Sequence, residues 1–256
     1  SRSENYISPK ASLAYQWSSD KGLKLASGRA VRMTTVSELY GATSNATLTL
    51  INDPNLRPEK SVTTELTLEQ DLGHSLLRTT LFHETTRDAL YSQLIPGSTT
   101  TSRVQNVGEV RTDGIELAYS GSGVLVRRLD LQGSLTYADS RIVSNPALPA
   151  SEGKIQPRVP VWRATALASY RLDEQQSGSL GVRYSCKQYS RLDNTDVNGS
   201  AYTGASPYLV LDARYRYRVA PKTVASLGVD NLTNRTYWNF HPYPQRTWVA
   251  EIKHSF

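Results

Sequence analysis

The sequence predicts an all-β fold, an antiparallel up-and-down transmembrane β-barrel with about eleven strands in this chain. Three observations predict it. Stretches of about ten residues alternate between apolar and polar side chains, and a period of two places successive side chains on opposite faces of a strand. Short and long connections alternate along the chain. Aromatic residues with a polar tip are in excess, with 15 Tyr and 4 Trp against 3 Phe, and such rings favour the lipid–water interface.

The predicted strands are joined by connections that are alternately short and long. In an up-and-down meander, alternate connections lie at the same end, as in outer-membrane barrels with tight turns on one side and extended loops on the other. The strands cover residues 9–17, 22–29, 59–70, 75–86, 107–119, 124–137, 160–171, 178–189, 208–219, 223–232 and 247–256. The long connections cover residues 30–58, 87–106, 138–159, 190–207 and 233–246.

The strands differ in how regularly they alternate. The strand at 75–86 is less regular because Arg78, Phe82 and Glu84 share a face. From 129 to 137 the odd positions hold Leu, Gly and Tyr and the even positions are all polar. In the strand at 160–171 the even positions from 162 are Trp, Ala or Tyr, and Leu167 is an apolar exception on the other face.

The strand at 208–219 places three arginines, at positions 214, 216 and 218, on one face. Arginines are expensive to bury in an apolar core, whereas a wet barrel lumen accepts them readily. The last strand has Trp248, Ala250, Ile252, His254 and Phe256 on one side and a mostly polar set on the other. A soluble two-layer sheet could also expose such polar faces, so a soluble all-β binding protein stays open from alternation alone.

Composition excludes several other classes. The mean hydropathy is −0.45, and no stretch approaches the roughly 18 apolar residues of a spanning helix, which argues against a helical membrane protein. A single Cys excludes a disulfide framework within the chain and any multi-Cys zinc site, and Cys186 is expected to be a small lipid-facing residue. The net charge is +6, but the basic residues are spread singly, so no nucleic-acid partner is expected.

Several short segments occur in order along nearly the whole chain. They are Gly28-Arg29, Ser37-Glu38-Leu39-Tyr40, Asp53-Pro54-Asn55-Leu56-Arg57-Pro58-Glu59-Lys60-Ser61, Thr112-Asp113-Gly114-Ile115-Glu116, Gly228-Val229-Asp230-Asn231-Leu232-Thr233-Asn234 and Pro244-Gln245-Arg246-Thr247, with a terminal Phe256. Gly114 lies within a strand, where glycine marks a bulge or a close backbone approach. The short polar side chains from Asp230 to Asn234 suit bonds to nearby backbone where a strand gives way to a loop.

Together these segments resemble the C-terminal half of TonB-dependent outer-membrane receptors, which transport siderophores, cobalamin and related scarce nutrients. The resemblance implies a 22-stranded barrel with a plugged lumen, of which residues 1–256 supply the C-terminal portion. The plug domain, the TonB box and the N-terminal barrel half are then expected outside this chain.

The resemblance also implies a location and partners. We expect the bacterial outer membrane, a ferric siderophore as cargo, and contact with TonB-ExbB-ExbD through the missing N-terminal part. Outer-membrane lipid and lipopolysaccharide are further expected partners. The barrel-assembly machinery is expected to read a terminal signal made of Trp248, Ile252 and Phe256.

No catalytic set, metal site or cofactor motif is found. The four His have no ligand spacing, and neither G-x-S-x-G nor a phosphate loop occurs. An enzyme is therefore not expected. A small stand-alone outer-membrane porin or enzyme remains the alternative, although eleven strands and the missing catalytic set argue against it.

Substrate contacts are expected in the long connections and the upper lumen, where aromatic faces and cationic groups suit anionic or aromatic iron chelates. The candidates are Tyr91, Arg103, Arg191, Tyr202, Trp238, His241 and Tyr243. The alternative is that Tyr237, Trp238 and Tyr243 belong to an outer aromatic girdle and that the arginines contact lipopolysaccharide phosphates.

Overall fold

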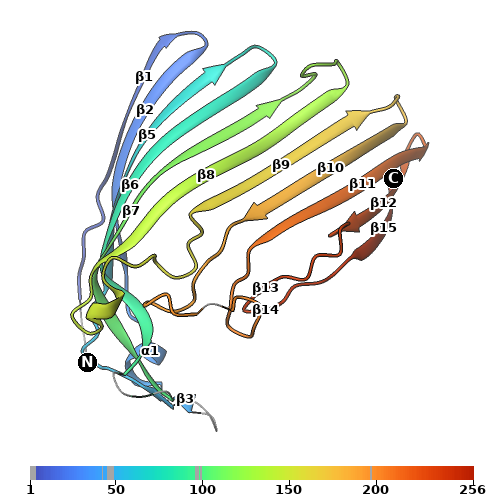
Figure 1. Cartoon of the computed structure of the whole chain (residues 1–256). Helices are drawn as coiled ribbons and strands as arrows, with labels where there is room; N and C mark the ends of the chain where they lie inside the picture. Colours follow the sequence, from blue (N-terminus) through green and yellow to red (C-terminus); the bar gives the residue numbers. More distant parts are fainter. Residues whose placement is uncertain (1–3, 42, 45–48, 96–97, 99, 197) are drawn as a thin grey trace.

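Eleven strands form one continuous curved sheet in the computed structural model (Figure 1). The structure describes residues 4–41, 43–44, 49–95, 98, 100–196 and 198–256. All neighbours along this path are antiparallel, which confirms the predicted fold class. In order across the sheet the strands are β1 (Lys10–Ser18), β2 (Lys21–Arg32), β5 (Glu59–Asp71), β6 (Ser75–Leu94), β7 (Thr101–Gly121), β8 (Leu129–Ser144), β9 (Trp162–Arg171), β10 (Gln176–Ser185), β11 (Tyr208–Ala220), β12 (Thr223–Asp230) and β15 (Thr247–His254).

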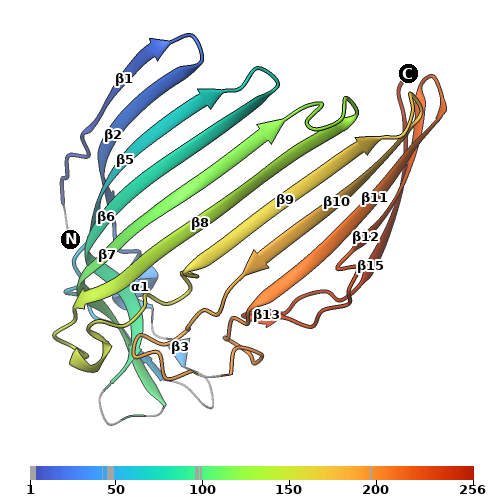
Figure 2. The same cartoon turned by 45° about the horizontal axis from the view of Figure 1, so that its top comes forward.

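The sheet is an open trough whose two edges are β1 and β15 (Figures 1 and 2). Within the described part of the chain, β1 pairs only with β2 and β15 only with β12. The short turns gather at the upper end of Figure 1 and the long connections at the lower end. The predicted sorting of connections is therefore confirmed.

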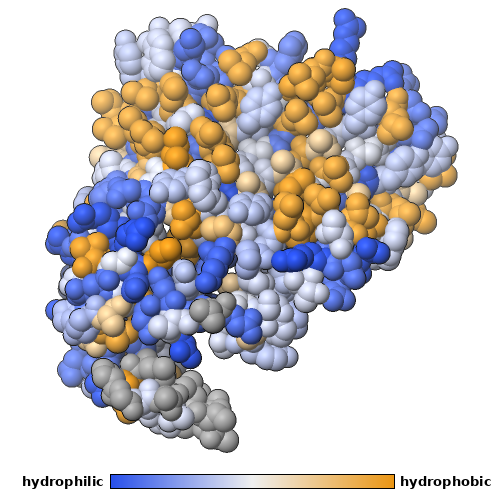
Figure 3. Space-filling model, in the orientation of Figure 1, coloured by the Kyte–Doolittle hydropathy of each residue, from blue (hydrophilic) through white to orange (hydrophobic). Residues whose placement is uncertain are grey.

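The two faces of the sheet differ in polarity. Residues that pair across neighbouring strands share a face, and the pairs Glu116 with Thr136 and Ser134 with Thr165 belong to the polar one. This polar face lines a hollow formed by β7–β12, so it is the inner side of the trough. The outer face carries pairs such as Leu117 with Leu135. Hydrophobic residues form broad patches over the upper part of the strands, and the lower end is mostly hydrophilic (Figure 3).

Aromatic residues border the outer apolar face at both ends. Tyr119 and Tyr170 lie towards the short turns, whereas Tyr137, Trp162 and Tyr184 lie towards the long connections. The rings of Tyr137 and Trp162 are neighbours, with centroids 4.9 Å apart. Two such borders are typical of the girdles that flank the apolar band of a membrane barrel.

The long connection predicted for residues 87–106 is wrong, because most of it belongs to β6 and β7. Their pairing continues from Ala89 with Val107 to Leu94 with Ser102. The strand bends at Asp88, which has φ 58° and forms ion pairs with Arg57 (2.7 Å) and Lys60 (3.5 Å). Beyond this bend the hairpin projects from the wall of the sheet. It remains ordered because buried residues of other connections pack on it.

Two further predicted strand boundaries are also wrong. The strand predicted for residues 124–137 begins at Leu129 and runs on to Ser144. Residues before it form a turn, in which the Val124 amide donates to the Leu129 carbonyl and Leu125 has φ 63°. The strand predicted for residues 178–189 covers Gln176–Ser185.

The first long connection, predicted for residues 30–58, contains a short helix and two short strands. Helix α1 (Val36–Tyr40) begins with a capping box formed by Thr35 and Glu38. Strands β3 (Thr43–Ser44) and β4 (Thr49–Ile51) pair with each other, and β4 also pairs in parallel with β7. Residues 45–48 of this connection lie outside the described residues.

The remaining short elements lie in the other long connections. They are the 3₁₀ helix η1 (Pro149–Ser151) and the two-stranded sheet of β13 (Trp238–Asn239) and β14 (His241–Pro242). No helix among the described residues is long and apolar enough to cross a membrane.

Candidate functional site

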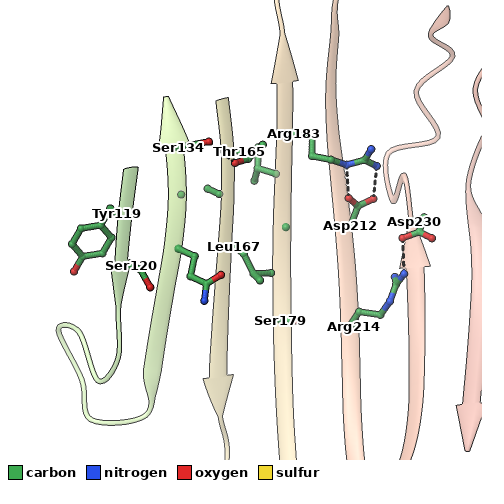
Figure 4. Close-up of a pocket in the computed structure, with 15 residues that line it drawn as sticks. Tyr119, Ser120, Ser134, Thr165, Leu167, Ser179, Arg183, Asp212, Arg214 and Asp230 are labelled. Carbon is green, nitrogen blue, oxygen red and sulfur yellow. Dashed lines mark hydrogen bonds and ion pairs between the residues drawn. The ribbon is translucent and has the colours of Figure 1, made fainter. Parts of the chain in front are cut away.

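The inner wall of the trough carries two arginine–carboxylate pairs on adjacent strands. Arg183 of β10 donates two hydrogen bonds to Asp212 of β11, from Nε at 2.9 Å and from Nη2 at 3.1 Å. Arg214 of β11 donates to Asp230 of β12 at 2.7 Å (Figure 4). Both pairs border a hollow of about 710 Å³ that small polar residues of β8 and β9 also line. The wall is therefore polar and fixed in geometry.

Gly228 makes the second pair possible. A Cβ at this position would lie 2.2 Å from Cδ of Arg214, so the arginine side chain crosses the glycine to reach Asp230. Next to it, the Asn231 amide donates to Asp212 at 2.9 Å, and Asn231 has φ 53°. The Asn231 side chain also exchanges hydrogen bonds with the backbone of Arg235. The expected backbone contacts of this segment are thus present.

Three tyrosines continue the inner wall towards the long connections, and we call them the tyrosine cluster: Tyr208, Tyr237 and Tyr243. The ring centroid of Tyr237 lies 4.8 Å from that of Tyr208 and 4.9 Å from that of Tyr243. Tyr237 is 3% exposed. Burial raises the pKa of its hydroxyl, and the positive charge of the nearby Arg183 partly offsets that rise. Tyr208 shares the inner face of β11 with Asp212, so the rings that pack on it lie towards that side.

A second aromatic group lies beside the tyrosine cluster in sequence, on β13 and β14. The ring centroid of Tyr202 lies 5.3 Å from that of Trp238 and 5.7 Å from that of His241, and both contacts are edge to face. Between β13 and β14, Phe240 lies under the guanidinium of Arg158, 3.3 Å from its ring centroid. Both Arg158 and Phe240 have φ 66°, which is rare for bulky residues and costs about 1–3 kcal/mol each.

The structure brings some of the predicted residues together and separates others. Tyr202, Trp238 and His241 form one aromatic group, and Tyr243 joins the tyrosine cluster. Tyr91 lies on β6, where its hydroxyl accepts a hydrogen bond from Gln156 at 2.6 Å. Arg103 lies on β7 in the projecting hairpin, and Arg191 is exposed between β10 and β11.

Sequence reasoning missed Arg158, Arg183 and Phe240 as neighbours of these aromatic residues. Arg183 could have been found from the alternation of its strand, since it shares a face with Gly181 and Ser179. The approach of Arg158 to Phe240 joins two connections and has no sequence signal. Burial lowers the pKa of Arg158, which Tyr91 and Asp196 partly counteract.

Chemically, this inner surface offers aromatic faces beside fixed guanidinium groups. Such a combination suits ligands that are anionic and carry aromatic or extended planar groups. Groups of His, Cys, Asp and Glu able to hold a metal ion do not occur among the described residues. The ligand contacts predicted for the individual side chains stay predictions.

The expected assembly signal lies on the edge strand. Trp248 and Ile252 are two exposed members of the outer face of β15, and Phe256 follows the strand, fully exposed. This arrangement presents large apolar groups beside an unpaired strand edge. Recognition by the assembly machinery remains a prediction.

Comparison with known proteins identifies the family to which the chain is similar. A family model described as "TonB dependent receptor-like, beta-barrel" matches residues 1–232. The probable TonB-dependent siderophore receptor PiuA of Acinetobacter baumannii is 27% identical over 73% of this chain and 25% of its own length. The vitamin B12 transporter BtuB of Vibrio cholerae is 25% identical over 95% of this chain and 36% of its own length.

Solved structures show the same fold. The crystal structure of PiuA superimposes with a TM-score of 0.68 at 23% identity, covering 94% of this chain and 33% of that chain. The copper transporter OprC gives a TM-score of 0.74 at 20% identity, covering 96% of this chain and 39% of that chain. The chain thus spans about a quarter to two fifths of the length of these proteins.

Proposed function

The chain belongs to the TonB-dependent receptor-like β-barrel family of the outer membrane, and we propose that it forms the C-terminal half of a receptor that imports a ferric siderophore. In this proposal the outer face contacts lipid and the inner face belongs to the lumen. The long connections form the ligand-capturing rim. A plug and further strands complete the barrel, and TonB-ExbB-ExbD supplies energy through the plug.

The observation that carries the proposal is the aromatic and cationic lining of the inner wall at its loop end. The tyrosine cluster lies beside the Arg183–Asp212 pair, and the positive charge of Arg183 acts on the Tyr237 hydroxyl. Ferric siderophores are commonly anionic and often carry planar aromatic donors, for which aromatic faces and guanidinium groups are complementary. The relative PiuA is described as a siderophore receptor, which supports the same cargo.

The half-barrel interpretation follows from the open edges. A row of unpaired backbone groups on β1 and on β15 is not tolerated in lipid, so both edges require partner strands. The matched relatives are about three to four times as long as their matched parts, which leaves room for those strands and a plug. We propose binding and transport and no enzymatic activity, because the family whose model matches this chain is described by a receptor barrel.

The test uses the full-length receptor that contains this barrel half. Tryptophan quenching would be titrated with a ferric catecholate siderophore, with cyanocobalamin and with Cu²⁺, and cellular uptake of each would be measured with and without TonB. We expect saturable binding and TonB-dependent uptake of the siderophore only. Binding restricted to cobalamin or copper would overturn the assigned cargo, and free ion conduction by the intact receptor would overturn the receptor function.

A further inference from the structure

The outer face of β6–β8 changes from apolar to charged towards the long connections. On β7 the outward series Tyr119, Leu117, Ile115 is followed by Asp113 and Arg111. The register places Arg111 opposite Arg141 of β8, and Asp113 opposite Asp139. Arg111 and Arg141 are therefore nearest cross-strand neighbours on one face. Like charges directly opposite each other destabilise a sheet, so each arginine needs an anionic partner.

Both arginine side chains are open to the surroundings but held in place. Their side chains are 50% and 51% exposed. Arg111 bonds Glu109 two residues along its own strand, at 3.1 Å, and Arg141 likewise bonds Asp139, at 2.8 Å. Arg141 Nη1 also donates to the Gly153 carbonyl at 3.1 Å.

These contacts leave several N–H donors unused. Nε and Nη1 of Arg111, and Nη2 of Arg141, have no hydrogen-bond partner among the described residues. A guanidinium presents five donors in a fixed fork that fits phosphate oxygens. Two neighbouring forks with free donors form a natural clamp for one phosphate group.

The aromatic border gives a reference point for the position of the Arg111–Arg141 pair along the strands. Tyr137, whose ring neighbours Trp162, ends the apolar series on β8. Arg141 lies four residues further, about 13 Å along the strand at roughly 3.3 Å per residue. With the strand tilt of membrane barrels, of about 40°, the rise is about 10 Å, which places the guanidiniums in the headgroup layer.

We propose that Arg111 and Arg141 bind the phosphate of an outer-leaflet glycolipid headgroup. We assign this end of the strands to the outer leaflet because the long connections lie there and form the ligand-capturing rim. The inference therefore rests on the membrane orientation given in the proposed function. The phosphate accepts charge-assisted hydrogen bonds from the free donors of both guanidiniums. Glu109 and Asp139 orient the two forks and act as positioning residues.

The test reconstitutes the full-length receptor in nanodiscs that contain either bisphosphorylated lipid A or lipid A without its phosphates, and counts retained lipid by native mass spectrometry. We expect about tenfold greater retention of the phosphorylated lipid by the wild type. Arg111→Gln with Arg141→Gln should abolish this preference. Arg111→Lys with Arg141→Lys should retain part of it, because the charge remains and the fork is lost.

The matched control is Arg216→Gln with Arg218→Gln, which removes two arginines from the inner face of β11 and should leave lipid retention unchanged. Heat-modifiable migration in gels confirms folding of each variant, and the lysine pair keeps the test open if the glutamine pair does not fold. Equal retention of both lipids by the wild type would overturn the inference, as would an unchanged preference in the glutamine pair. Displacement of the lipid by inorganic phosphate at equal concentration would overturn the lipid assignment. Siderophore uptake, measured separately, distinguishes these failures from failure of the receptor function.

Discussion

At the scale of single residues, neighbours on both adjacent strands leave no room for a side chain at Gly114. A Cβ at this position would lie 2.2 Å from the ring of Phe82 on β6 and 2.4 Å from the Tyr137 carbonyl on β8. The ring of Phe82 covers the glycine across the strand pair. Gly114→Ala should displace that ring and the backbone of β8, and we expect a loss of about 2–3 kcal/mol in the free energy of unfolding.

Urea unfolding of the full-length receptor in lipid vesicles would measure this loss. The control is Gly181→Ala, at which the nearest atom to an added Cβ is Cβ of Asp212 at 3.7 Å, an ordinary contact. Equal stability of Gly114→Ala and Gly181→Ala would contradict the close-approach explanation. The sequence alone allowed either a bulge or a close approach, and the regular register through Gly114 selects the approach.

Tyr243 provides a residue-scale test of the binding surface. Its ring stacks on Tyr237 with an interplanar angle of 29° and is 40% exposed, so one face remains available. Tyr243→Leu keeps apolar bulk but removes the aromatic face, and we expect siderophore affinity to fall by about tenfold. Fluorescence titration checks this, with Tyr15→Leu on β1 as the control because that side chain lies on the outer face. An unchanged affinity would remove Tyr243 from the site.

At the scale of elements, helix α1 depends on its capping box. Glu38 accepts hydrogen bonds from the Thr35 amide at 2.8 Å and from Arg32 at 2.6 Å. Burial by itself raises the pKa of the Glu38 carboxyl, but these hydrogen bonds outweigh it and hold the pKa below its usual value. A folded pKa below the unfolded one stabilises the helix above the unfolded pKa, and this stabilisation is lost as pH falls through the folded pKa.

We therefore expect α1 to open more readily as the pH falls below about 4.5, by less than about 1 kcal/mol because the ion pair is partly exposed. Hydrogen exchange of the α1 amides, corrected for intrinsic rates, would measure it. Glu38→Gln should remove the pH dependence. A helix that opened equally in the variant and the wild type across this range would contradict the capping account.

The strands and the connections differ in how well sequence predicts them. Strands such as β8, β9 and β11 have one lipid-facing and one wet face, so polarity alternates and their existence can be read directly. The outer parts of β6 and β7, past the bend at Asp88, project from the wall of the sheet. There Val104 and Val107 pack against residues from other connections, among them Leu39 and Leu192. These strand ends therefore do not alternate between a lipid-facing and a wet side. The connections that pack on them cannot be identified from the sequence alone.

At the scale of the whole molecule, prediction of the site stops where distant connections meet. Tyr202 meets Trp238 and His241 because the last two long connections come together, whereas Tyr243 stacks on Tyr237 of its own connection. Composition alone selects them as aromatic residues in loops. Arg158 packs over Phe240 only when both residues adopt a strained backbone with positive φ. The folded long connections hold them in that conformation, and no local sequence pattern predicts it.

The direction of the edge strands determines how the barrel can close. Because eleven strands alternate without exception, β1 and β15 run in the same direction. A second copy in the same membrane orientation would offer β1 to β15 in parallel, against the antiparallel pairing of every other neighbour. Antiparallel pairing between copies would require opposite orientations, with long connections on both sides of the membrane. An odd number of additional strands, in contrast, closes the sheet with antiparallel pairs throughout.

We therefore expect this chain alone not to form a closed two-copy barrel. Refolded into lipid vesicles, residues 1–256 should show neither heat-modifiable migration nor a stable dimer in analytical ultracentrifugation. Supplied together with the remaining part of the receptor, the chain should regain heat-modifiable migration, and a cysteine at Val249 should cross-link to the first strand of the barrel. A monodisperse two-copy barrel with protected edges would contradict this, and it would require parallel pairing between β15 and β1 that the strand directions make unfavourable.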